Sequence, residues 1–231
     1  MSEQAVATAT MTITTIESVS AAPPSSEAES GHPRSALAAA AEAAGLAVLA
    51  TAAWPESAAD AAAPALAGFV VSAFSPIAAE VARRCLSRRP VPNSDPASDP
   101  GSGLVSGPDS ALEPAPVVAV IIISELGDIT SAEHVAETVD AEGRIGPLLF
   151  FQSVPNAVAG YVATQGRLTG PVVCVGGVGN GLDVAGLLIE DGDADQALLV
   201  RIDLARAADP QDRAEAVLLA AGSPYSEGVE P

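Results

Sequence analysis

Residues 147–175 read PLLFFQSVPNAVAGYVATQGRLTGPVVCV, and this stretch decides the fold. A helix is predicted from about residue 153 to residue 167, because proline is common in the first turn of a helix and small residues follow it. The step at residues 169–171, Thr-Gly-Pro, then interrupts the helix. The apolar run at residues 172–175 is short and β-branched, which predicts a buried strand.

The same alternation of strands and helices continues on both sides of this stretch. The run at residues 117–124, VVAVIIIS, is continuously apolar, which is typical of a strand that is covered on both faces. Capping-box spacing at Thr130 and Glu133 predicts the start of a helix. The predicted strands are 45–54, 117–124, 172–175, 197–202 and 214–220, the last of which could also form a helix. The other predicted helices are 75–89, 130–140 and 181–191. Such alternation predicts an α/β layered domain with a mostly parallel mixed sheet.

Composition divides the 231 residues into one folded domain and three segments without a predicted core. Residues 1–44 are rich in Ala, Ser, Thr and Glu, which predicts a disordered extension with a short helix at residues 35–44. The folded domain is expected at residues 45–222. It is interrupted at 90–116 by an insertion that is rich in Pro, Ser, Asp and Gly, and residues 223–231 form a flexible tail.

The charge balance excludes several functions. The chain carries 29 acidic and 10 basic residues, a formal net charge of −19, which disfavours binding to nucleic acid and to anionic membranes. All the basic residues are arginines, and without lysine neither a Schiff base nor a Walker-type phosphate loop is available. Two cysteines, Cys85 and Cys174, are too few for a disulfide framework or a zinc site. We therefore expect no cofactor and no metal.

A cytoplasmic location is expected from the absence of targeting signals. The N-terminus carries Glu3 and no basic region before an apolar stretch, so it does not resemble a secretory signal. Residues 61–79 are uncharged and long enough to be considered as a membrane span. Two prolines and many alanines within them favour a buried segment of a soluble protein instead.

The order of these signals resembles the N-terminal half of β-ketoacyl synthases. In that family a helix beginning with Pro and Asn precedes a Leu-x-Gly-Pro step into a central strand, as residues 155–175 do here. An acidic turn at residues 191–195, the strand at 197–202 and the segment 212–219 continue the likeness, which covers roughly residues 117–220. The resemblance implies a thiolase-like half-domain. It also implies that a nucleophilic cysteine should follow the central strand at the N-terminus of a helix.

The catalytic residues of that family are missing from this sequence. The nucleophile position falls near Gly179, where the sequence reads GGVGN at residues 176–180. Cys174 lies about five residues too early, inside the apolar strand, where burial would raise its pKa and keep it inert. The family's two histidines come from a second half that has no counterpart here, and His32 and His134 match neither of them. The sequence therefore predicts a catalytically inactive subunit.

Among ketosynthase-like proteins, this profile resembles the truncated chain-length factors of type II polyketide synthases that make aryl polyenes or highly reduced chains. The resemblance implies a heterodimer with a catalytic ketosynthase, reached by the acyl carrier protein only through the complex. It implies an interface at an exposed strand with an unpaired edge, formed by Pro171, Val172, Val173, Cys174 and Val175. The residues expected to shape a tunnel for the growing chain are Phe150, Phe151, Val154, Asn156, Ala157, Tyr161 and Thr164. Phe150 and Phe151 are predicted in an extended segment, and residues 157, 161 and 164 on one helical face.

Other interpretations remain open at this point. Gly177, Gly179 and Gly181 between a strand and a helix, with Asp203 at the end of the next strand, could belong to a dinucleotide-binding module. The chain could also be a ketosynthase remnant with a purely structural role. The aromatic residues at 150, 151 and 161 could be ordinary core packing. The arginines at 83, 84, 88 and 89 suit a helix C-terminus, and contact with a carrier protein or partner is the alternative.

Overall fold

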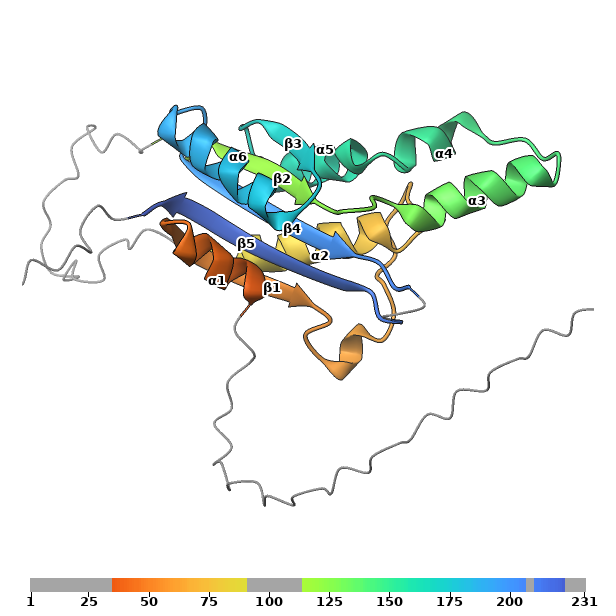
Figure 1. Cartoon of the computed structure of the whole chain (residues 1–231), viewed down its shortest axis with the longest axis horizontal. Helices are drawn as coiled ribbons and strands as arrows, with labels where there is room; N and C mark the ends of the chain where they lie inside the picture. Colours follow the sequence, from red (N-terminus) through yellow and green to blue (C-terminus); the bar gives the residue numbers. More distant parts are fainter. Residues whose placement is uncertain (1–34, 91–113, 207–209, 223–231) are drawn as a thin grey trace, which may run out of the picture. The chain divides into compact units, whose positions relative to one another are not determined.

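A computed structural model describes residues 35–90, 114–206 and 210–222, and its centre is a five-stranded mixed sheet (Figure 1). The strand order is β1-β5-β4-β2-β3. β2, β3 and β4 are parallel, whereas β5 runs antiparallel to both of its neighbours. The strands are β1 (Leu46–Trp54), β2 (Val118–Ile123), β3 (Val172–Val175), β4 (Gln196–Asp203) and β5 (Arg213–Ala221). The α/β class and the mostly parallel mixed sheet predicted from the sequence are confirmed.

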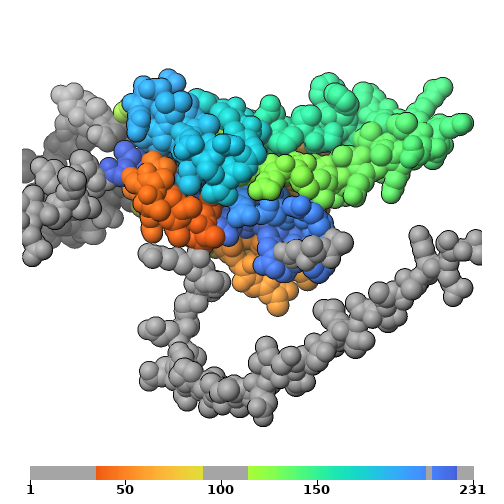
Figure 2. Space-filling view, viewed as in Figure 1, coloured from red at the N-terminus to blue at the C-terminus, as the bar shows by residue number. Residues whose placement is uncertain are grey.

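Helices cover both faces of this sheet. The helices are α1 (Ala36–Ala43), α2 (Phe74–Ser87), α3 (Ile129–Asp140), α4 (Pro147–Gln152), α5 (Pro155–Gly166) and α6 (Val178–Glu190). α2 and α5 pack on one face, where Ile77, Val81 and Val158 are fully buried. α1 and α6 pack on the other, through Leu37 and Leu182, and Figure 2 shows the side of the molecule that carries them.

The position of β2 between the two cores explains why its sequence is continuously apolar. Its side chains alternate between the two cores: Val120 and Ile122 face α2 and α5, while Ile121 and Ile123 face α1 and α6. All six residues of the strand are buried. Because β2 also pairs with β3 on one side and β4 on the other, it is the most enclosed strand of the sheet.

The N-terminal boundary of the folded part lies earlier than predicted. Ser35 caps α1 by accepting a hydrogen bond from the backbone N–H of Ala38 (3.1 Å), and its hydroxyl donates to the Glu215 carboxylate of β5 (2.8 Å). Leu37 is fully buried. The short helix expected at residues 35–44 is present as α1, and the expected disordered extension therefore cannot include these residues. Its remainder, together with residues 91–113 of the insertion and the tail at 223–231, lies outside the described residues.

Two local predictions around α3 and α4 are wrong. The N-cap of α3 is Asp128, whose carboxylate accepts from both the N–H (3.1 Å) and the hydroxyl (2.7 Å) of Ser131. A buried carboxylate with two donors satisfies the helix end better than the predicted cap at Thr130, which lies inside the helix. Phe150 and Phe151 lie in α4, not in an extended segment, because Pro147 begins a short helix there.

The uncharged stretch at residues 61–79 does not form one long helix. It runs through an irregular segment and enters the first turns of α2. Among the described residues, no helix has the length and apolar character needed to cross a membrane.

Candidate functional site

The candidate site begins where β3 leads into α6. β3 ends at Val175, and Gly177 caps α6 with a φ of 82°, a backbone conformation that favours glycine. The side-chain amide of Asn180 donates to the Gly176 carbonyl (2.6 Å) and fixes the turn. α6 therefore starts three residues before the predicted position, and Gly179 lies in its first turn. β3, the turn and α6 form a strand–turn–helix junction, and Gly179 is the residue near which the family resemblance predicts the nucleophile position.

Cys174 lies next to this junction on β3. It is half-buried against the α2 and α5 core. Burial raises the pKa of its thiol to about 11, so the thiolate is scarce at neutral pH. A small cavity of about 190 Å³ lies beside it, lined by Ile122, Ser124, Pro155, Cys174, Val175 and Gly176. This environment gives Cys174 the character of a packing residue.

β3 is an edge strand. This corrects the burial predicted from its apolar run, whereas the exposed strand edge expected from the ketosynthase resemblance is present. Within the described residues it pairs with β2 alone, and Val172 is 41% exposed. The predicted interface residues Pro171–Val175 therefore form a continuous segment with one free backbone edge. An unpaired strand edge of this kind is suited to pairing with another chain.

Gly170 sets the position of this edge. Its N–H donates to the Val118 carbonyl (3.1 Å) at the start of β2. A β-carbon at this position would lie 2.5 Å from the backbone carbonyl atoms of Val118. The Thr-Gly-Pro step thus lets the chain pass close against β2 before Pro171, whose carbonyl accepts from Val120 (2.8 Å).

A larger cavity, of about 480 Å³, lies between α2, α5 and residues 64–66. Tyr161 of α5 reaches it and makes an edge-to-face contact with Phe69, with ring centroids 6.3 Å apart. The residues that line it are Pro64, Ala65, Leu66, Pro76, Ala79, Glu80, Ala82, Arg83, Leu86, Tyr161, Val162, Gln165 and Gly166. Its volume and its mostly apolar walls are in the range of small-molecule pockets.

The predicted tunnel residues are not brought together in this cavity. Of the seven, Tyr161 alone lines it. Phe150 and Phe151 are 72% and 69% exposed on α4. Val154 is the N-cap of α5, Asn156 and Thr164 are exposed, and Ala157 is half-buried.

The residues of α2 that line this cavity were missed by sequence reasoning. Pro76, Ala79, Arg83 and Leu86 recur at three- and four-residue intervals, which places them on one face of the helix. That spacing was visible in the sequence, but it does not distinguish the wall of a cavity from ordinary core packing.

The arginine cluster is engaged in ion pairs within the chain. Arg84 pairs with Asp60 (2.7 Å) and Glu80 (2.8 Å), and its guanidinium carbon lies 4.9 Å from the centre of the Trp54 ring. Arg83 pairs with Glu80, and Arg88 pairs with Glu56. Three of the four arginines therefore have carboxylate partners. The pairs with Asp60 and Glu56 connect the segment after β1 to α2.

The topology separates the parts of a dinucleotide site. β2 lies between β3 and β4, so the glycines at 177–181 and Asp203 follow strands that are not neighbours. Asp203 pairs instead with Arg201 (2.8 Å) on the same strand. Across residues 35–90, 114–206 and 210–222, no cluster of His, Cys, Asp or Glu has the composition of a metal site.

Comparison with known proteins identifies the fold. No protein-family model matches the sequence, and no curated protein matches it. Among solved structures, the complex of the ketosynthase ApeO with its chain length factor ApeC from Xenorhabdus doucetiae is similar, with a TM-score of 0.54 and 17% identity. That match covers 78% of this chain and 80% of the other chain. The chain therefore has the thiolase-like fold of ketosynthases and their relatives.

Two further structures give weaker matches. The ishigamide ketosynthase/chain length factor has a TM-score of 0.49 and 14% identity, over 70% of this chain and 47% of the other. A β-ketoacyl synthase from Burkholderia phymatum also has a TM-score of 0.49, with 13% identity, over 72% of this chain and 46% of the other. This chain spans about half the length of these two.

Proposed function

We propose that this chain is a non-catalytic, chain-length-factor-like subunit that pairs with a catalytic ketosynthase. The observation that carries the proposal is the free edge of β3, which leads directly into a helix junction with glycine in place of a nucleophile. Condensation of acyl groups requires a reactive thiolate, and Cys174 keeps its proton at neutral pH. The chemistry is then supplied by the partner.

The length of the matched chain supports this proposal. The shares covered in the first comparison, 78% of this chain and 80% of the other, are nearly equal, so the two chains are of similar length. The complex concerned contains a ketosynthase and a chain length factor.

Charge supports a division of labour within the complex. Acyl carrier proteins are typically acidic, and this chain carries a net charge of −19. Like charges disfavour docking of a carrier on this subunit, so the carrier reaches the complex through the ketosynthase.

Co-expression with a candidate ketosynthase tests the pairing. We expect a 1:1 complex that survives size-exclusion chromatography. Val172→Lys should weaken it about 10-fold or more, because a lysine on an edge strand opposes strand pairing. Val139→Lys is the matched control, since Val139 is also exposed but lies on α3. The proposal would be contradicted if the wild-type chain formed no complex with the ketosynthase, or if the two lysine substitutions weakened the complex equally.

The finer part of the proposal is that α5 helps to set the length of the product. Ala157 is half-buried, and Tyr161 lines the cavity against α2. If the growing chain lies along this face, Ala157→Phe yields shorter products and Tyr161→Ala yields longer ones.

Product profiling by mass spectrometry measures both effects, and size-exclusion chromatography verifies that each complex is intact. Unchanged product lengths from two intact complexes would remove α5 from the tunnel. Loss of stability without any change in length would assign Tyr161 and Ala157 to packing alone.

A further inference from the structure

The second free edge of the sheet belongs to β1. Within the described residues β1 pairs with β5 alone, so its other side offers backbone donors and acceptors. The strand is nine residues long, LAVLATAAW, and contains neither a charge nor a proline. Natural proteins usually protect long apolar edges of this kind, because they template pairing with other chains.

An ion pair occupies the C-terminal half of this edge. Arg88 donates from Nη1 to the Thr51 carbonyl (2.9 Å), and the Ala53 N–H donates to Glu56 Oε1 (2.9 Å). Residues two apart on a strand direct their backbone groups to the same side, so both bonds are on the side away from β5. They replace two hydrogen bonds that an added strand would make.

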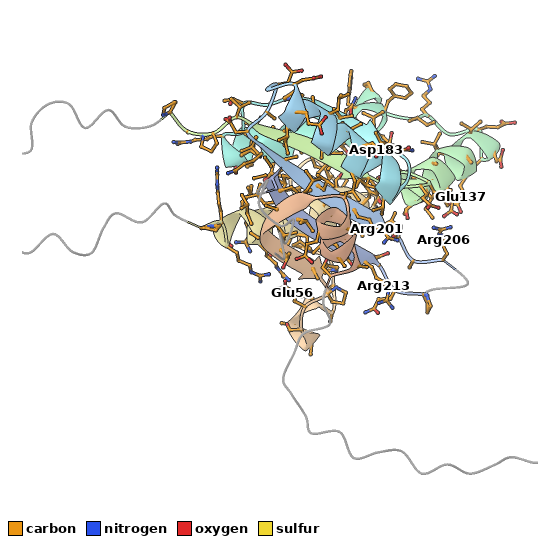
Figure 3. The ribbon with its side chains drawn as sticks, turned by 60° about the vertical axis from the view of Figure 1, so that its left-hand side comes forward. Glu56, Glu137, Asp183, Arg201, Arg206 and Arg213 are labelled. Carbon is orange, nitrogen blue, oxygen red and sulfur yellow. The ribbon has the colours of Figure 1, made fainter. Side chains whose placement is uncertain are left out.

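The two side chains are held in place by each other and by their surroundings. The two terminal guanidinium nitrogens of Arg88, Nη1 and Nη2, donate to the Glu56 carboxylate at 2.6 and 2.7 Å. Glu56 lies in the segment that follows β1, where Figure 3 labels it, and Arg88 is the C-cap residue of α2. Arg84 Nη1 lies 3.6 Å from the second oxygen of Glu56. The hydrogen bond from Arg88 also lowers the pKa of Glu56, so the carboxylate stays charged at neutral pH.

We propose that the Glu56–Arg88 pair caps the β1 edge against pairing with a second copy of this chain. A second copy is the expected occupant because two identical edges can pair antiparallel about a twofold axis. β1 is nine residues long, with one irregularity between Val48 and Ala50, whereas β3 has four residues. With these two groups of β1 occupied, pairing of β1 with another strand is disfavoured, and β3 is the edge that remains open.

Arg88→Met tests the cap, because methionine keeps much of the apolar stem and removes both donors. Arg83→Met on the same helix is the matched control, since Arg83 contacts Glu80 and no strand. Both changes are made in full-length chain that also carries Val172→Lys, so that the β3 edge does not contribute. Sedimentation velocity over a concentration series measures self-association, and circular dichroism monitors folding.

We expect Arg88→Met to strengthen self-association about 10-fold or more and Arg83→Met to leave it unchanged. A further change, Thr51→Lys, should reverse the effect by placing a charge on the uncapped edge. Equal behaviour of the two arginine variants would overturn the proposal. So would self-association of Arg88→Met that Thr51→Lys does not reverse, since general unfolding produces that result.

Discussion

Gly170→Ala should lower the free energy of unfolding by about 3 kcal/mol, the upper part of the range for overpacked sites. The new methyl group would overlap the Val118 backbone at the start of β2, and a backbone cannot rotate away as a flexible side chain can. β3 would have to move from its register with β2. For a domain of this size the midpoint of thermal unfolding should fall by roughly 10 °C.

Gly160→Ala is the matched control for this experiment. Gly160 lies inside α5, and a β-carbon there meets nothing within 4 Å. Alanine is favoured over glycine in a helix interior by about 1 kcal/mol, so this variant should be slightly more stable than wild type. Thermal denaturation of both variants separates the predictions. A Gly170→Ala protein as stable as the control would mean that residues 169–171 can withdraw from β2 freely.

Arg84→Met should cost about 2 kcal/mol at neutral pH, because it leaves the Asp60 carboxylate largely buried without its ion-pair partner. The same change removes the contacts of Arg84 with Glu80 and with the Trp54 ring. Arg83→Met is again the control. Arg83 is 66% exposed, and an exposed ion pair contributes about 0.5 kcal/mol.

The difference between wild type and Arg84→Met should depend on pH. The Arg84 guanidinium holds the pKa of Asp60 well below its usual range, and the pKa of Glu80 is also lowered, chiefly by Arg83 and further by Arg84. A carboxylate with a lowered pKa in the folded state stabilises fully above its unfolded pKa, near 4. That contribution is lost as the pH falls toward the folded value. Urea titrations at pH 7, 5 and 3 should therefore show a difference that shrinks at pH 3, and a constant difference would contradict this origin.

The sequence predicted the structure best for segments whose contacts all lie within this chain and follow a local residue pattern. β2 was predicted because residues that face two cores in alternation must all be apolar. α2 and α5 were predicted because proline near the first turn and a regular spacing of apolar residues act within a few positions. These signals are local, and no partner is needed to interpret them.

The predictions failed where a segment's surroundings decide its structure. An apolar run such as residues 172–175 looks the same whether the same chain buries it or leaves it open. Its pattern alone therefore predicted a buried strand, and only the family resemblance indicated an exposed edge. Two adjacent phenylalanines favour a strand, yet the proline at residue 147 begins a helix at that point. The 480 Å³ cavity depends on residues 64–66 lying beside α2 and α5, which no local pattern reveals.

The pairing of β1 with β5 has a consequence for synthesis of the protein. Glu215 of β5 binds Ser35 and the N–H of Leu37, across separations of 180 and 178 residues. While the chain emerges from the ribosome, β1 therefore has no partner strand until β5 has been synthesised. The sheet is completed by pairing two strands from opposite ends of the folded domain, β1 and β5. Pairing between residues so far apart in the sequence is slow. Until that moment β1 is exposed to other chains, and it is then that β1 depends most on protection from unwanted pairing.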